Sequence, residues 1–248
     1  MFSSAIVRIP GKSLIDGLTD SKHLGVPDYA NAINQHKSYI EALQFCGLEV
    51  TILEPCEEYP DSTFVEDVAL ITPRCAIITR PGAESRRGEV EKIISVLETQ
   101  FNNLEAIEAP GTIEAGDIMM VGSHYYIGLS DRTNIQGAKQ LINLLEKHGY
   151  TGSTVNLKDV LHLKTGLSYL ENNMLVVCGE FISDPIFSEF EQIEIPQSES
   201  YAANSIWVND NVIIPSGYPV AKDKISASGY NVCLLYTSPS PRDKRQSR

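Results

Sequence analysis

The chain has 248 residues and the composition of an ordinary globular protein, with 42% hydrophobic residues, 21% charged residues and a formal net charge of −12. Such an acidic balance argues against nucleic acid and anionic membranes as partners, because both require a basic surface. The N-terminal residues lack the features of a signal peptide and no apolar run approaches the about 18 residues of a membrane-spanning helix, so we expect a cytoplasmic protein.

Four segments carry apolar residues at helical spacing and are predicted to form helices. Three of them end at Gly47, Gly149 and Gly229, as expected for glycine in the left-handed conformation that stops a helix. A short strand is predicted after each helix, and a fifth strand at 192–196. The predicted helices are 30–46, 88–101, 134–148 and 219–228, and the strands after them are 48–55, 104–110, 152–157 and 230–232.

Four predicted hairpins precede the last four of these strands. Each consists of two apolar runs around a short polar turn, such as Gly122-Ser123 or Asn209-Asp210. The hairpins are 68–81, 117–129, 167–179 and 204–215. The repeating unit is therefore a loop, a hairpin, a helix and a strand, with a period of roughly 40–55 residues. About five units fit, which indicates an α/β fold; an ordinary α/β sandwich with coincidental spacing is the alternative.

The loops that open these units carry ionisable residues at matching positions, and arginines follow the first two hairpins. They are Asp61, Glu66 and Asp67 in 61–67, Glu114 and Asp117 in 111–117, His162 and Lys164 in 161–166, and Arg80, Arg86, Arg87 and Arg132. Carboxylates suit a planar guanidinium, and arginines suit a carboxylate at the far end of the same ligand. An arginine-like amino acid satisfies both, with His162 as a proton shuttle beside Glu114.

Each of these residues also has a purely structural interpretation. Glu66 and Asp67 are compatible with a solvated loop pair, Arg86 with surface charge, and His162 with a histidine that only fills space between leucines. A divalent metal is a weaker functional alternative, because no H-x-x-x-H spacing occurs and arginines repel a cation. The recurrence of the polar residues at one point of the unit favours the ligand site.

Five motifs resemble one known family. FVEDVAL, ITRPGAESRR, EAGDIM, GLSDRTNIQGA and LHLKTG occur in this order and are similar to those of the dimethylarginine dimethylaminohydrolases, in the guanidino-group-modifying (pentein) superfamily. The resemblance covers residues 5–232 approximately. It implies a five-bladed α/β propeller of ββαβ units with the last unit incomplete. It also implies hydrolysis of methylated arginines to citrulline and methylamine or dimethylamine, without metal or organic cofactor.

The resemblance implies roles for the residues around the reacting group. His162 is expected to be the acid and base, with Glu114 beside it. Asp67 and Glu66 are expected to hold the guanidinium, and Phe64, in the same motif, is also expected to bind substrate.

Four further residues are implied to bind the amino-acid end of the substrate. Arg86 and Arg132 are expected to hold the α-carboxylate and Asp61 the α-amine, while Leu18 matches a mobile lid that contacts substrate through its backbone. The partner is thus a small molecule, a methylated arginine; the oligomeric state, including a homodimer, stays open.

One departure from the family concerns the nucleophile. The family's cysteine follows a Gly-Gly-x-x-Ser motif that this sequence lacks, and Cys233 lies within the predicted strand after Val232, so we reject it as the nucleophile. Residues 233–243, CLLYTSPSPRD, also match a translated sequencing-library adapter. We therefore predict one catalytic domain at 1–232, a non-native disordered tail at 233–248 and an inactive chain. A genuine basic tail, an arginine deiminase and a protein that only binds arginine-like ligands are the alternatives.

Overall fold

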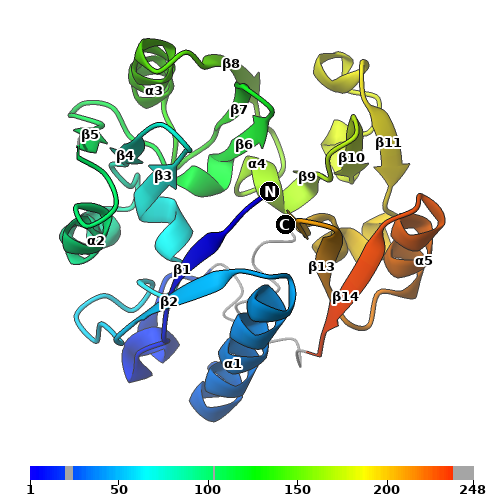
Figure 1. Ribbon diagram of the computed structural model, residues 1–248, viewed down its shortest axis with the longest axis horizontal. Coiled ribbons are helices and arrows are strands. Elements are labelled where there is room, and N and C mark those ends of the chain that lie inside the picture. The colour runs from blue at the N-terminus through cyan, green and yellow to red at the C-terminus, as the bar shows by residue number, and fades with distance from the viewer. Residues whose placement is uncertain (20–24, 103, 237–248) are drawn as a thin grey trace. The chain divides into compact units, whose positions relative to one another are not determined.

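The computed structural model describes residues 1–19, 25–102 and 104–236. In this part of the chain the strands form five small sheets, four of three strands and one of two. Each three-stranded sheet consists of an antiparallel hairpin and a third strand that pairs in parallel with the second. This is the predicted repeating unit, and its strands and helices are labelled in Figure 1. The chain divides into two compact units, Phe64–Lys158 and Met1–Thr63 with Asp159–Arg248.

The unit Phe64–Lys158 contains two of these sheets. The first consists of β3 (Ala69–Ile71), β4 (Ala76–Ile78) and β5 (Leu104–Ala106), and the second of β6 (Ile118–Val121), β7 (His124–Leu129) and β8 (Thr151–Asn156). A parallel strand can be reached only by a crossover. The crossovers are formed by α2 (Glu91–Leu97), which follows the 3-10 segment Glu84–Val90, and by α3 (Ile135–Lys147).

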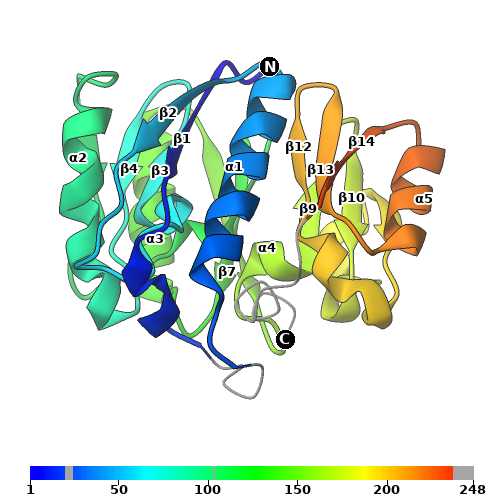
Figure 2. The same ribbon diagram turned by 90° about the horizontal axis from the view of Figure 1, so that it is seen from below.

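The other unit contains the two-stranded sheet and the remaining two three-stranded sheets. Its sheets are β1 (Ser4–Arg8) with β2 (Glu49–Leu53), then β9 (Leu167–Tyr169), β10 (Met174–Val177) and β11 (Glu191–Glu194), then β12 (Ile206–Val208), β13 (Asn211–Pro215) and β14 (Asn231–Leu235). Its helices are α1 (Tyr29–Phe45), the single turn α4 (Leu163–Gly166) and α5 (Pro219–Ala227). Helix α5 packs against β14 (Figure 2).

Local sequence explains where helix α3 begins and ends. The side chain of Asn134 accepts a hydrogen bond from the Gly137 amide at 2.8 Å and so caps the first turn. At the other end Gly149 has a φ of 76°, and the Tyr150 amide donates back to the Leu145 carbonyl. The periodic apolar face then places Leu141 and Leu145 in the core.

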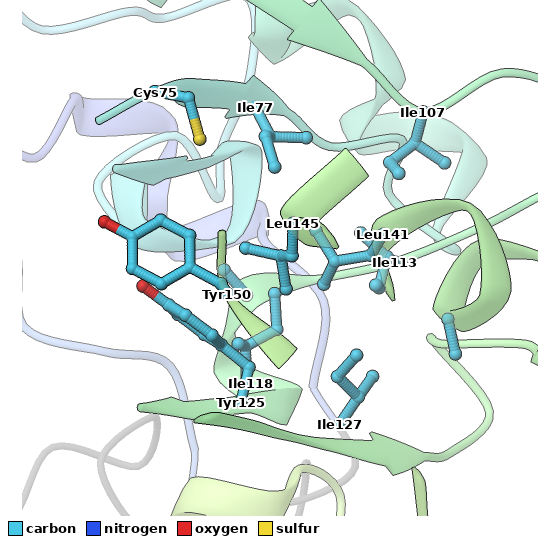
Figure 3. Packing of buried hydrophobic residues seen from close by; sticks show 12 residues of the cluster. Cys75, Ile77, Ile107, Ile113, Ile118, Tyr125, Ile127, Leu141, Leu145 and Tyr150 are labelled. Atoms are coloured by element: carbon cyan, nitrogen blue, oxygen red, sulfur yellow. The ribbon is translucent and has the colours of Figure 1, made fainter. Parts of the chain in front are cut away.

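That core is the main hydrophobic cluster of Phe64–Lys158 (Figure 3). Ile127 and Leu145 have no exposed surface, and the rings of Tyr125 and Tyr150 meet edge to face with centroids 5.4 Å apart. Burial, followed by the neighbouring Tyr150, raises the pKa of the Tyr125 hydroxyl, so this group stays neutral. Residues of both sheets and of α3 contribute, so the two units of the repeat share one core.

The predicted hairpins are confirmed, and α1, α3 and α5 lie within one residue of the predicted helix bounds. The helix predicted at 88–101 is shorter, because the chain around Gly88 forms 3-10 turns before α2 begins. Strand β1 and helix α4 were not predicted. None of the helices in the described ranges combines the length and the apolar character needed to cross a bilayer.

One predicted boundary in the C-terminal part lies too early in the chain. The sheet β12-β13-β14 has three strands, and the two-stranded sheet of the described residues is β1-β2. Strand β14 also continues through Cys233 to Leu235, because Cys-Leu-Leu supplies apolar residues that can extend a parallel strand. The predicted disorder from residue 233 onward is therefore wrong for residues 233–235; residues 237–248 lie outside the described part.

Candidate active site

Arg86 is the centre of a buried ion cluster in Phe64–Lys158. Its Nη1 donates to Asp67 Oδ2 at 2.6 Å and lies 3.9 Å from Glu114 Oε2. Its Nε and Nη2 donate to the two carboxylate oxygens of Glu89 at 3.1 and 2.9 Å, and Nη2 also donates to the Phe64 carbonyl. All four charged residues are buried, with at most 8% of their surface exposed.

The cluster contains three carboxylates and one guanidinium. Burial by itself lowers the pKa of Arg86, but the charges of Asp67, Glu89 and Glu114 outweigh it and raise this pKa above its ordinary value. Arg86 is therefore always charged. With all three carboxylates ionised the cluster carries a net charge of −2, from one positive and three negative groups. Such a cluster favours a further cation.

Backbone contacts fix Asp67, which was predicted to hold the guanidinium, and Glu114, which was predicted to lie beside His162. Asp67 lies in a short 3-10 turn, Val65–Val68, and its Oδ1 accepts a hydrogen bond from the Gly116 amide at 3.0 Å. Glu114 precedes the turn Ala115–Asp117, and its Oε1 accepts from the Ala83 amide at 3.3 Å. Asp67 is thus held by the loop that carries Glu114, and Glu114 is held by the loop that leads to Arg86.

Three residues of this unit that were predicted to bind substrate lie outside the buried ion cluster or contact it only through the backbone. Glu66 is exposed, and Phe64 is half-buried and joins the cluster only through its carbonyl. Arg132 is half-buried in the loop between β7 and α3, where its amide donates to Ser130 Oγ at 3.0 Å. Among the described residues no ion pair engages its guanidinium, so Arg132 differs from Arg86, whose donors are taken by protein acceptors.

The other unit brings together Asp61 and Leu18. Asp61 is only 6% exposed, and its Oδ2 accepts a hydrogen bond from the Leu18 amide at 3.0 Å. The Leu18 side chain is 39% exposed, and the residues just after it, 20–24, lie outside the described part. The residue predicted for the α-amine therefore also anchors the segment predicted as the lid.

His162 lies in the same unit at the start of helix α4. It is half-buried, and its carbonyl accepts hydrogen bonds from the amide and the hydroxyl of Thr165 at 3.1 and 2.6 Å. These bonds fix the backbone of His162, the residue that immediately precedes the single turn of α4. The single turn of helix was not visible in the sequence because four residues are too few for a periodic pattern.

Cys233 lies in the middle of strand β14, paired with Ile213. Burial raises the pKa of its thiol, and burial together with Cys233 raises that of Cys46. Burial likewise raises the pKa of Cys75 and Cys178, which are both buried. A thiol with a raised pKa is mostly protonated at neutral pH and is a poor nucleophile.

We expect Cys233 to react slowly with iodoacetamide at pH 7.5, by about tenfold or more relative to free cysteine, because both its raised pKa and its strand position lower the reactive thiolate. The rate should rise as the pH increases beyond the ordinary cysteine pKa. Mass spectrometry of the alkylated chain measures this, and rapid alkylation at neutral pH would contradict it.

Sequence reasoning missed two sets of residues. Glu89 was not predicted, although it follows Arg86 by three residues, a spacing that allows an ion pair within a helical turn. Ser130 and Thr133 were not predicted either; both donate to Asp117, a residue noted in its loop but given no role.

A repeated ββαβ architecture with a buried, net acidic site is the class of the guanidino-group-modifying α/β proteins. Residues 27–212 match the family model described as N,N dimethylarginine dimethylhydrolase, eukaryotic. The chain is also 60% identical to N(G),N(G)-dimethylarginine dimethylaminohydrolase of Pseudomonas aeruginosa over 239 residues, 96% of this chain and 94% of the relative. The chain belongs to the dimethylarginine dimethylaminohydrolase family, which makes it a member of a family of hydrolases.

Two solved structures of the family match the whole fold. A cysteine-to-serine variant of the Pseudomonas aeruginosa enzyme in complex with citrulline superposes with a TM-score of 0.94 at 60% identity, covering 96% of this chain and 93% of that one. An adduct of a histidine-to-glycine variant with S-methyl-L-thiocitrulline gives a TM-score of 0.94 at 57% identity, with 98% of both chains covered. The predicted α/β fold of ββαβ units and the predicted family are confirmed.

Proposed function

We propose that the site of this chain takes NG-methylated arginines, and that the reaction it serves is their hydrolysis to citrulline and methylamine or dimethylamine. The observation that carries the proposal is the net acidic cluster of Asp67, Glu89 and Glu114 around Arg86. A planar guanidinium offers five N–H donors and one positive charge, which complement buried carboxylates. The citrulline complex of the Pseudomonas aeruginosa relative supports an arginine-like ligand.

The proposed roles follow the charges of the residues. Asp67 and Glu114 bind the guanidinium, and Glu66, the exposed neighbour of Asp67, stands at the entrance to them. Arg132 binds the α-carboxylate, because its guanidinium is available among the described residues. Arg86 was predicted to share that carboxylate, but at least four of its hydrogen bonds go to protein acceptors, which favours a role in holding Asp67.

Asp61, with the Leu18 segment that it anchors, is proposed to bind the α-amine. His162 is proposed as the group that protonates the leaving amine and then activates water, which is general acid–base chemistry that an imidazole can perform. We assign the nucleophile to none of the cysteines whose pKa is raised. The free state of all five cysteines suits a reducing cytoplasm, which we propose as the location; light scattering would measure whether the chain is a homodimer.

Calorimetric titration with L-citrulline and with NG,NG-dimethyl-L-arginine tests the binding proposal. We expect both to bind to the 248-residue chain, with D-enantiomers at least tenfold weaker because inversion at the α-carbon moves the α-amine relative to the α-carboxylate that Arg132 binds. Asp67→Asn should weaken the methylated arginine by about tenfold to a hundredfold, the range for a lost charged hydrogen bond. Glu84→Gln, an exposed carboxylate of the same unit, is the control.

Turnover distinguishes the alternatives. We expect no citrulline from the 248-residue chain, and no change on Cys233→Ser. Citrulline formation that Cys233→Ser abolishes would overturn the rejection of Cys233. Citrulline formed from unmethylated arginine in preference to dimethylarginine would instead identify an arginine deiminase.

A further inference from the structure

Asp117 is a fully buried carboxylate outside the ion cluster around Arg86. None of its surface is exposed, and its Oδ2 accepts two short hydrogen bonds, from Ser130 Oγ and from Thr133 Oγ1, both at 2.6 Å. Distances of this size are typical of a hydroxyl that donates to an ionised carboxylate, and such bonds are about twice as strong as neutral ones. Ser130 and Thr133 both belong to the loop between β7 and α3, so Asp117 binds that loop at two points.

The two hydroxyls pass this constraint on to backbone groups. Each has one proton, which it gives to Asp117, so each can only accept from its other neighbours. Ser130 Oγ accepts from the amide of Arg132 at 3.0 Å and from that of Thr133 at 3.2 Å. Thr133 Oγ1 accepts from the amide of Glu114 at 3.2 Å. One carboxylate therefore fixes the backbone of Arg132 and the backbone of Glu114 together.

Gly82 closes the loop from another direction. A Cβ atom on Gly82 would lie 2.4 Å from the Arg132 carbonyl oxygen and 2.6 Å from its Cα, so the two backbones are in direct contact. The backbone of Arg132 is thus held by the hydrogen bond that its amide donates to Ser130 Oγ and by packing against Gly82. These contacts fix the backbone of Arg132 and leave only its side chain free to change conformation.

We propose that Asp117 is a positioning residue for ligand recognition: it locks the Ser130–Thr133 loop and so sets Arg132, for the α-carboxylate, at a fixed place relative to Glu114, for the guanidinium. The inference rests on the proposed function for the nature of the two ligand ends. A rigid separation between these two groups selects the length of the ligand. Asp117 acts through hydroxyls and touches no ligand itself.

The variant Asp117→Asn tests this proposal, because it keeps the size of the side chain and removes the charge. The matched control is Asp131→Asn, an exposed carboxylate on the same loop. Amide hydrogen exchange measures the stability of the loop without any ligand. We expect the amides of residues 130–134 to exchange about tenfold faster in Asp117→Asn, because one charge-assisted hydrogen bond is lost. Their exchange rates should be unchanged in Asp131→Asn. Ser130→Ala should give a smaller change in the same direction.

Ligand titrations measure the second half of the proposal. Asp117→Asn should weaken the binding of L-citrulline by about tenfold. It should hardly change the binding of the same ureido compound without its α-carboxylate. In combination with Arg132→Ala, Asp117→Asn should have almost no further effect on citrulline, since the group that it positions is gone. If Asp117 had only a structural role, Asp117→Asn would weaken the binding of both ligands equally, and its effect would add to that of Arg132→Ala.

The possible failures are distinguishable. Unchanged exchange of residues 130–134 in both Asp117→Asn and Ser130→Ala overturns the proposal. Faster exchange in a chain that binds no citrulline even as the wild type supports the locked loop and refutes the proposed function. If Asp117→Asn does not fold, Ser130→Ala alone decides, by the same exchange and titration measurements.

Discussion

Replacing Arg86 by methionine is expected to lower the free energy of unfolding by about 3–5 kcal/mol, the usual cost of removing one partner from a buried ion pair. Arg86 neutralises part of the charge of Asp67, Glu89 and Glu114, and all three carboxylates remain buried when it is removed. Urea unfolding followed by circular dichroism measures the change.

The neighbouring arginine provides the control. Arg87 forms an ion pair with Glu84 whose carboxylate is 86% exposed, so Arg87→Met should cost no more than about 1 kcal/mol. Equal losses for the two variants would contradict a special role for the buried cluster.

The loss caused by Arg86→Met is expected to depend on pH. Without the guanidinium the buried carboxylates repel one another, so their pKa values in the folded variant rise above those in the unfolded chain. The folded variant then binds more protons than the unfolded chain, and its stability increases as the pH falls. The difference between Arg86→Met and wild type should therefore shrink from pH 8 to pH 5, whereas a loss of packing alone would be the same at both.

The sequence predicted the elements of this fold better than their contacts. Hairpins such as 117–129 and helices such as α3 are recognisable because their period and their capping residues, for example Asn134, are local. Strand β1 was missed because its residues SAIVR are too short and too mixed to show alternation. Strand β14 was ended too early because composition, and not apolar pattern, was used to set its boundary.

The site shows the same division. The polar loops that open the units identified Asp67, Glu114 and Asp117, and the segments that follow the first two hairpins identified Arg86 and Arg132. Which of these residues form ion pairs with one another could not be predicted, because the sequence around Arg86 is equally compatible with a ligand-binding role and with a structural one. Asp67 is 19 residues away from Arg86 along the chain and Glu114 is 28 residues away, so only folding brings them together.

The second large effect is expected at Gly82. The variant Gly82→Ala adds a methyl group where three backbone atoms of Arg132 lie within 3.0 Å, and backbone cannot rotate out of the way as a side chain can. One of the two segments must move, so we expect a loss of about 1–3 kcal/mol of stability, as for other overpacked sites. Because Arg132 is displaced, the binding of citrulline should also weaken by about tenfold or more.

Gly122→Ala separates this packing effect from an effect of glycine flexibility. Gly122 has a φ of 58°, and nothing lies within 4 Å of the position that its Cβ would take. Alanine there should cost about 1–2 kcal/mol through backbone strain alone and leave the affinity for citrulline unchanged. If Gly82→Ala loses stability without losing affinity, the backbone of Arg132 is not what sets ligand binding, and the α-carboxylate must be bound by another cation. If it loses both, close contact between the two loops is the reason that glycine stands between Pro81 and Ala83.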